Sequence, residues 1–388
     1  MRKEIALVDC NNFFVGCEML LNPDLIGKPV CVLSNNDGCV ISRSNEAKKL
    51  GVKMCSPYFM AKREFPEVIY LSSNMSFYLG ISKRIMQMLY DYTPVIEIYS
   101  IDEAFLDLTG MAKIFKMSYE ELILKIKTDI KDKIGIDVSV GLANSKILAK
   151  IATDKAKKAN GVYRIKYENI ENELINISVQ DVWSVGRNTT SCLKRYGIFS
   201  ALDVLSKSDD FYKKIMGKRG LELKYELSGE NVLSVVCKVL PPKSLQKTSS
   251  FPEFSSDKIY IKSTLNYHLH NICSKLRRLG LKANVVCVML RTKDFRVFVE
   301  RIFLLKPLNS EYFLAKEVEK LFNKIYEKDI IYRSSGIFVE DLKAASPNQL
   351  DIFENKTEKK AQQISLVWDR IEKKYGKGLL SIGFPISQ

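Results

Sequence analysis

The chain has 388 residues, 46% of them hydrophobic and 10% aromatic. This composition excludes a disordered or fibrous protein, and at about 100–200 residues per domain the length suggests two to four globular domains. The formal net charge of +15 points to a polyanionic partner, either nucleic acid or an acidic membrane. No apolar run approaches the roughly 18 residues of a membrane-spanning helix, and the first residues lack a secretory signal pattern. We therefore expect a cytoplasmic protein with no membrane partner.

Cysteine and histidine are not expected to carry chemistry. The nine cysteines include no C-x-x-C pair, which predicts reduced, packed thiols rather than a zinc site or a disulfide framework. His268 and His270 are two residues apart and would point to different faces of a helix. The chain also lacks a G-x-x-x-x-G-K-[ST] phosphate-binding loop.

A strand that ends in a carboxylate opens the chain. Residues 5–8 are apolar and precede Asp9, and Asn11 or Asn12 is expected to cap the helix that follows. Because ligands gather at strand ends in open α/β sheets, Asp9 is a candidate functional residue.

A small basic unit comes next. Residues 29–33 and 38–42 predict a hairpin with Asp37-Gly38 as its turn. A short helix follows, with a Ser or Asn cap at 44–45 and a stop at Gly51. The positive edge of this unit is explained as well by a solvated charged face as by a binding role, and its basic residues are Arg43, Lys48 and Lys49.

Two carboxylates lie in a predicted turn between two strands. After an amphipathic helix over residues 74–92, residues 95–98 and 103–108 read as strands around Asp102 and Glu103. A helix over 118–133, a strand over 136–143 and a lysine-rich helix capped by Asn144 follow. The order predicts a mixed sheet of split βαβ type with helices on one face.

The remaining chain separates into a helical part, a linker, a second α/β unit and a tail. Residues 169–235 are helical, and the turn Val182–Arg187 resembles a helix-hairpin-helix, although an ordinary connection between two helices fits nearly as well. Residues 240–244 are a proline-containing linker. Beyond it, the predicted order is β-α-β-β-α-β, with strands near 247–251, 283–292, 295–304 and 335–340 and helices near 259–279 and 311–326.

The tail contains an isolated apolar pentapeptide. It lies in a polar segment that we expect to be mobile, and its spaced apolar anchors favour a docking motif over a packed strand. Its residues are Gln349, Leu350, Asp351, Ile352 and Phe353.

The carboxylates of Asp9, Asp102 and Glu103 are the strongest chemical signal. Taken alone, Asp102 and Glu103 fit an ordinary polar turn. If the strand ends bring all three together, they repel one another unless a cation is present. Oxygen ligands without histidine or thiolate suit Mg²⁺, and two such ions serve displacement at phosphorus. With a basic chain, the expected substrates are a nucleoside triphosphate and a nucleic acid end.

These segments resemble a known family. Residues 5–18 and 99–108 resemble the two carboxylate motifs of Y-family (translesion) DNA polymerases, and residues 34–43, 46–48 and 50–54 resemble the UmuC-type branch (ImpB, MucB and SamB). The resemblance covers residues 4–353, and it is most specific in the paired carboxylate motifs.

The resemblance implies an α+β multidomain, right-hand polymerase with a ferredoxin-like palm, small fingers, a helical thumb with a helix-hairpin-helix, and a separate βαββαβ little-finger domain. The palm would comprise residues 1–20 and 75–168, and the fingers 21–74. The thumb would comprise 169–239, the linker 240–246, the little finger 247–343, and the tail 344–388.

It also implies roles for single residues. Asp9, Asp102, Glu103 and the Cys10 carbonyl would hold two Mg²⁺ ions, with Ser100 in support. Phe14 matches the steric gate against a ribose 2′-OH, although a core aromatic is the alternative. Asn45 departs from the usual tyrosine of the family, which leaves the triphosphate contacts open. The implied nucleotide-binding residues are Phe13, Phe14, Arg43, Lys48 and Lys157, and the implied DNA-binding residues are Val185, Gly186 and Arg187.

The implied partners are primer-template DNA, dNTP and a sliding clamp bound by residues 349–353, with UmuD-like or recombinase accessory proteins as further candidates. No stretch resembles a proofreading exonuclease, so error-prone synthesis is expected. Two other functions stay open: a catalytically silent DNA-binding accessory factor in DNA repair on the same scaffold, and another palm-type nucleotidyl transferase or cyclase acting on small nucleotides.

Overall fold

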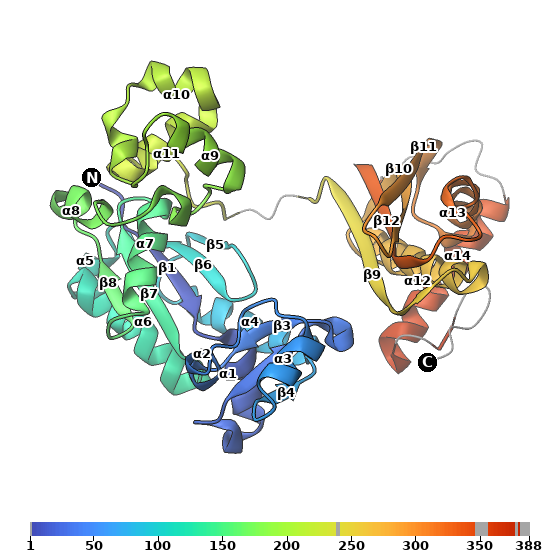
Figure 1. The fold of residues 1–388 in the computed structure, drawn as a ribbon, viewed down its shortest axis with the longest axis horizontal. Coiled ribbons are helices and arrows are strands. Elements are labelled where there is room, and N and C mark those ends of the chain that lie inside the picture. The colour runs from blue at the N-terminus through green and yellow to red at the C-terminus, as the bar shows by residue number, and fades with distance from the viewer. Residues whose placement is uncertain (1, 238–240, 346–355, 377–378, 381–388) are drawn as a thin grey trace. The chain divides into compact units, whose positions relative to one another are not determined.

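The computed structural model describes residues 2–237, 241–345, 356–376 and 379–380. The chain divides into two compact units, residues 1–239 and 240–388, which are described separately (Figure 1). The division falls at the predicted linker, but strand β9 (Ser244–Ser255) already begins inside residues 240–246. The predicted clamp-binding peptide, residues 349–353, lies outside the described residues. Within the described ranges, no helix is long and apolar enough to cross a membrane.

A five-stranded sheet forms the centre of the first unit, in the order β5-β6-β1-β7-β8. The central strand β1 pairs antiparallel with β6 on one side and β7 on the other, so that Asp9 faces Glu103 directly. All six residues of β1 are buried, as expected for a strand covered on both faces. The strands are β1 (Ile5–Cys10), β5 (Ile96–Ile98), β6 (Glu103–Asp107), β7 (Val138–Ala143) and β8 (Val162–Arg164).

Helices cover both faces of this sheet, so the prediction of helices on one face is wrong. Ala6 and Val8 pack against α4 (Met75–Leu89) and α6 (Tyr119–Ile134). Ile5 and Leu7 pack against α7 (Lys146–Ala156). Alternate residues of a strand point to opposite faces. Because β1 is apolar at both sets of positions, both faces need a cover. The remaining short helices of this part are α1 (Phe13–Leu21) and α5 (Met111–Phe115).

Two predicted helix caps are wrong in detail. Asn12 precedes α1, but its side chain makes no cap hydrogen bond. Ser145, not Asn144, caps α7 by accepting from the Leu148 N–H. The side-chain amide of Asn144 instead donates to the carbonyl of Lys3. This contact with a distant segment replaces the predicted cap.

The insertion between α1 and α4 forms its own small sheet and core. The predicted hairpin is confirmed, since β2 and β3 pair antiparallel. Its turn is not Asp37-Gly38, because Asn36 and Asp37 have φ of 65° and 50° while Gly38 has φ of −75°. Ser44 caps the following helix, as predicted. The elements are β2 (Val30–Leu33), β3 (Val40–Arg43), β4 (Ile69–Leu71), α2 (Asn45–Lys49) and α3 (Tyr58–Glu64).

Short helices make up the rest of the first unit and share a core with α7. Helix α9 starts directly after Gly186, and Gly197 follows its end at φ 76°. A single 3-10 turn, Val179–Asp181, precedes the connection to α9. The helices are α8 (Ile170–Leu174), α9 (Arg187–Arg195), α10 (Asp209–Met216) and α11 (Lys218–Ser228).

The second unit has the predicted β-α-β-β-α-β order, in a sheet arranged β11-β10-β12-β9. Its core lies between this sheet and two helices, α12 and α13 (Figure 1). The elements after β9 are α12 (Lys258–Arg278), β10 (Leu281–Thr292), β11 (Val297–Leu308), α13 (Glu311–Ile325) and β12 (Tyr332–Ala344).

A third helix, α14 (Lys356–Tyr375), packs on this unit where a mobile polar tail was predicted. Its Trp368 ring stacks on the His270 ring at 4.2 Å, and Asp369 pairs with Arg277 at 2.7 Å. Among the described side chains of α14, the buried stripe is narrow, with Ala361, Ser365 and Trp368 as its members. Such a stripe is easily mistaken for a solvated charged segment, and the expectation of a mobile tail is wrong for this part.

Candidate active site

Asp9 and Glu103 form a buried carboxylate pair at the end of β1. They lie directly opposite each other in the antiparallel pairing, and opposite residues share one face of a sheet with Cβ atoms about 5 Å apart. Asp9 is 6% exposed and follows Ile5 and Leu7 in the alternation, which places its side chain on the face that α7 covers. Two carboxylates this close and this buried need positive charge nearby.

Two lysines of the α7 segment supply that charge. Lys150 Nζ lies 3.0 Å from Asp9 Oδ2 and also donates to Glu103 Oε1. Lys157 Nζ lies 2.8 Å from the same Asp9 oxygen. The two lysines are two helical turns apart and therefore share a face. Lys157 is among the nucleotide-binding residues that the family resemblance implies. Lys150 is not among them, although its helical spacing from Lys157 is a signal that the sequence contains.

The pKa values of the two carboxyl groups shift in opposite directions. Burial and the hydrogen bond with Asp9 raise the pKa of Glu103 to about 7, with Lys150 opposing the shift. Burial would also raise the pKa of Asp9, but the hydrogen bond with Glu103 and the two lysines outweigh it and lower that pKa. The same carboxylates raise the pKa of Lys150 against the effect of its burial. The lysines thus favour the anionic form of Asp9, and burial favours the protonated form of Glu103.

Asp102 joins this site through its main chain. Its carbonyl accepts from the Cys10 N–H at 2.9 Å, which holds the β5–β6 turn against the end of β1. Its side chain is held by Ser100, whose hydroxyl donates to the carboxylate and accepts from the Asp102 N–H. Ser100 therefore shapes the turn, in line with its predicted supporting place.

The donors fit a hard cation. The carboxylates of Asp9 and Glu103 face each other across a lysine ammonium, so this position already attracts positive charge, and oxygen ligands are those that Mg²⁺ prefers. In this conformation, no three Asp, Glu, His or Cys side chains of the described residues gather closely enough to hold a metal ion. Two of the three predicted ligands are therefore together, and the carboxylate of Asp102 is hydrogen-bonded to Ser100 instead.

The predicted nucleotide-binding cations share one electrostatic environment. Burial lowers the pKa of Lys48, and the charges of Arg43 and Lys157 lower it further while Asp9 opposes them. Lys48 Nζ donates to Asn12 Oδ1, and Asn12 donates to Asn45 Oδ1 at 3.0 Å. Helix α2 is thereby tied to the β1–α1 junction. Arg43 also has a structural contact, because its guanidinium donates to the Val52 carbonyl.

The two phenylalanines at the start of α1 differ. Phe13 is 3% exposed and belongs to the core, so its side chain is not placed to touch a nucleotide. Phe14 is only partly buried and stacks on the Tyr78 ring, with the centroids 5.0 Å apart. Tyr78 is itself fixed by a hydrogen bond to Glu18. The Phe14 ring is therefore held firmly from one side.

The predicted DNA-binding turn lies at the start of α9. Gly186 and Arg187 are exposed, whereas Val185 is buried in the neighbouring core. Gly186 precedes the first turn of the helix, where main-chain N–H groups favour an anion such as a phosphate.

Comparisons with known proteins place the chain in a family. Residues 8–154 match the impB/mucB/samB family, and residues 242–352 match the C-terminal domain of that family. The chain is 32% identical to Protein UmuC of Salmonella typhimurium, over 97% of this chain and 92% of the relative. It is 31% identical to DNA polymerase IV of Alkaliphilus oremlandii, over 98% of each chain.

Similar solved structures support the same family. A Y-family DNA polymerase chimera of Dbh and Dpo4 superimposes with a TM-score of 0.75 at 28% identity, covering 88% of this chain and 99% of the chimera. An insertion ternary complex of Dbh DNA polymerase gives a TM-score of 0.56 at 27% identity, covering 87% and 98%. Together with the carboxylate pair at the end of β1, these matches show that the chain belongs to the impB/mucB/samB family and is a UmuC-like, Y-family DNA polymerase.

Proposed function

We propose that this polymerase performs error-prone translesion synthesis by transferring a nucleotidyl group from a dNTP to a primer 3′-OH, with two Mg²⁺ ions and without proofreading. The buried pair of Asp9 and Glu103, bridged by Lys150, carries the proposal. It is a site that concentrates negative charge at a strand end and keeps it neutralised by a movable cation.

Asp9, Asp102, Glu103 and the Cys10 carbonyl are the proposed Mg²⁺ ligands. When bound, Mg²⁺ would supply charge neutralisation at the phosphates and lower the pKa of the attacking hydroxyl. Rotation of the Asp102 side chain away from Ser100 would complete the ligand set. Lys150 then serves as the counter-charge that keeps Asp9 and Glu103 together before the metal binds.

Lys48, Lys157 and Arg43 are proposed to hold the triphosphate. Their common environment beside Asp9 supports this role, because cations that repel one another are stabilised by a polyanion. A lysine is a mobile point charge, so Lys48 can exchange Asn12 for a phosphate oxygen. For Phe13 we propose only a main-chain contact with the nucleotide.

Phe14 is proposed as the steric gate, with Tyr78 as its support. The test is Phe14→Ala in primer extension with ribonucleotides, which should then be incorporated. Unchanged sugar discrimination would refute the gate.

We propose the domain division given above: palm, fingers, thumb (169–239) and little finger (247–343). The exposed Gly186 and Arg187 at the start of α9 are the proposed contacts to the DNA backbone, with Val185 packing behind them.

Residues 349–353 are proposed to bind a sliding clamp, which would raise the effective concentration of the polymerase at the primer end. Their deletion should leave distributive extension intact and abolish stimulation by the clamp. Persistent stimulation would contradict the docking role. UmuD-like and recombinase accessory proteins are further proposed partners, in line with the similarity to Protein UmuC.

The deciding experiment is primer extension with Mg²⁺ on undamaged and lesion-containing templates, comparing the native chain with Asp102→Ala. We expect extension and lesion bypass from the native chain only. Equal extension by both proteins would remove the catalytic assignment and favour a silent DNA-binding factor. Product formed without primer-template would favour a small-nucleotide transferase.

A further inference from the structure

Helices α12 and α13 pack side by side, and residues of both line a groove between them. One face of α12 presents residues at helical spacing along it: Ile259, Ser263, Asn266, His270 and Arg277. The matching face of α13 presents Glu311, Ala315, Val318 and Phe322. The helices are antiparallel here, because Arg277 contacts Glu311 while Lys262 contacts Glu319.

Helix α14 fills one end of this groove. Its apolar anchor Trp368 stacks on His270, and its acidic residues Asp369 and Glu372 pair with Arg277 and His270. Ser365 adds a hydrogen bond of 2.9 Å to Glu311. The occupant of the filled end is thus an amphipathic helix whose carboxylates meet cations of α12.

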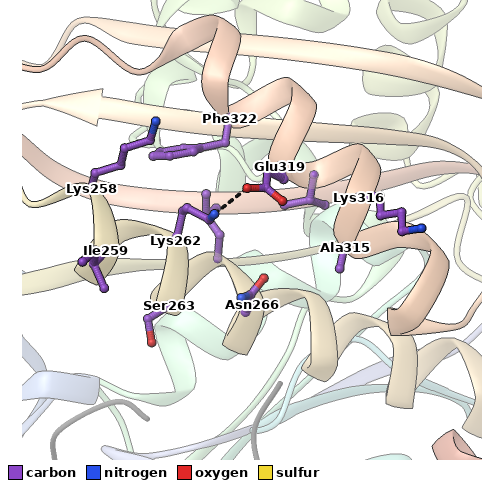
Figure 2. Close-up of a pocket in the computed structure, with 11 residues that line it drawn as sticks. Lys258, Ile259, Lys262, Ser263, Asn266, Ala315, Lys316, Glu319 and Phe322 are labelled. Atoms are coloured by element: carbon purple, nitrogen blue, oxygen red, sulfur yellow. Dashed lines mark hydrogen bonds and ion pairs between the residues drawn. The ribbon is translucent and has the colours of Figure 1, made fainter. Parts of the chain in front are cut away.

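The other end of the groove is an open pocket of about 360 Å³. Phe322, Leu265 and Val318 give it an apolar floor, and Ile259 stands at its edge with 56% of its surface exposed. Figure 2 shows Lys262 and Glu319 directed toward each other across the pocket. Three lysines line the pocket, Lys258, Lys262 and Lys316, against the single carboxylate of Glu319. Lys262 pairs with Glu319, and the ammonium groups of Lys258 and Lys316 lie over the rings of Tyr326 and Tyr312.

We propose that this open pocket docks an acidic amphipathic helix of a partner protein. Basic side chains of α12 lie at both ends of the groove, Arg277 and His270 at the filled end and Lys258 and Lys262 at the open end, and the filled end shows which kind of segment meets such side chains. The excess of lysines over carboxylates selects acidic residues beside the apolar anchor, since complementary charge gives specificity and a faster association. A phosphate backbone would use the lysines but leave the apolar floor and Ile259 without contact.

The test uses the full chain and a fluorescently labelled amphipathic helical peptide with Leu and Trp on one face and Glu beside them. Its binding is measured by fluorescence polarisation. A peptide with Lys in place of Glu and a labelled DNA duplex are measured in parallel. We expect binding of the acidic peptide, and a loss of about tenfold in affinity for the double variant Lys258→Glu, Lys316→Glu. Ile259→Asp should cause a similar loss, and because Ile259 is exposed this variant should fold normally.

Lys320→Glu is the matched control, because Lys320 lies on α13, is exposed and does not line the pocket. It should bind the acidic peptide as the native chain does, and all variants should retain basal primer extension. An equal loss with Lys320→Glu, equal binding of the Lys peptide, or no peptide binding would overturn the proposal. It would also be overturned if the pocket variants weakened only duplex binding, or if Ile259→Asp dissociated a self-associated chain, since the occupant would then be DNA or a second copy.

Discussion

Each of the two units contains a cluster of buried carboxylates, and the two clusters differ in the cations that neutralise them. In the first unit, Asp9 and Glu103 are neutralised by Lys150 and Lys157. In the second, Glu311 and Asp369 are neutralised by Arg277, with His270 between Glu311 and Glu372. A lysine is a single charge on a flexible stem, whereas arginine is a planar fork that binds carboxylates at two points. The contacts of the first cluster therefore hold single-charge cations, and those of the second hold a bidentate fork.

The surroundings reinforce this difference. Arg277 donates to both Glu311 oxygens and both Asp369 oxygens, and its side chain is buried between α12, α13 and α14. Lys157 is more than a third exposed. A carboxylate cluster whose cations reach solvent is therefore suited to binding, and one whose cation is enclosed is suited to holding a helix in place.

The largest effect should come from removing a carboxylate of the first cluster. Glu103→Gln should lower primer extension on the order of 10³-fold, because a metal contributes several kcal/mol of charge stabilisation and each 1.4 kcal/mol is tenfold in rate. Asp107→Asn is the control, since Asp107 lies in the same strand and pairs with Lys3 instead. Single-turnover extension measures both. A similar loss in both variants would mean that strand β6, and not the site, had been disturbed.

Breaking the second cluster should destabilise the fold without this loss of activity. Arg277→Ala leaves Glu311 and Asp369 without their main partner, which costs about 3–5 kcal/mol for a buried ion pair. Urea unfolding followed by Trp368 fluorescence in a Trp183→Phe background reports on the second unit. The exposed Arg278 gives the control Arg278→Ala, expected within about 0.5 kcal/mol of the parent. If the two arginine variants unfold alike, the cluster contributes little to stability.

Replacing Lys150 should test whether Mg²⁺ can take over its role as the cation of the first cluster. Lys150→Ala should lose about 2 kcal/mol of stability in EDTA, since it leaves close carboxylates uncompensated. Mg²⁺ should restore more stability to this variant than to the native chain. Thermal unfolding with and without Mg²⁺ measures the difference, and Lys155→Ala, whose partner is Glu173, should show no such gain. An equal Mg²⁺ effect in all three proteins would argue against metal binding at Asp9 and Glu103.

The smallest effect should be a pH dependence of the second cluster. Burial would lower the pKa of His270, but hydrogen bonds to Glu311 and Glu372 outweigh it and raise that pKa. The stabilisation is complete below the unfolded value near 6.5 and is lost as the pH rises through the folded pKa. The stability difference between native and His270→Gln proteins, about 1 kcal/mol for one hydrogen bond, should therefore shrink toward alkaline pH.

The stability contribution of His268 should depend on pH in the opposite direction. Its burial lowers its pKa to about 4, so its contribution is lost as the pH falls from about 6.5 toward 4. Comparing His268→Gln with His270→Gln by urea unfolding across this range separates the two. The same direction of change in both variants would show that their environments are not as different as the structure indicates.

The three carboxylates and most of the elements could be predicted from the sequence alone. Asp9 follows a short apolar strand, Asp102 and Glu103 lie between two more, and the family motifs cover these segments, so local patterns were sufficient. The β-α-β-β-α-β order of the second unit was also predictable, because each element has its own hydrophobic period.

Which side chains meet could not be predicted in this way, because it depends on how distant segments pack. The register of β1 against β6 pairs Asp9 with Glu103. Helix α7 packs on the same face of the sheet, so that Lys150 contacts both carboxylates although it is far from them in the sequence. Helix α14 was missed for a similar reason. Among its described side chains, the buried stripe of Ala361, Ser365 and Trp368 is narrow. The partners of its carboxylates Asp369 and Glu372 are Arg277 and His270 of α12. Local patterns report what a segment could bury, whereas the partner of a buried charge exists only once distant segments have packed together.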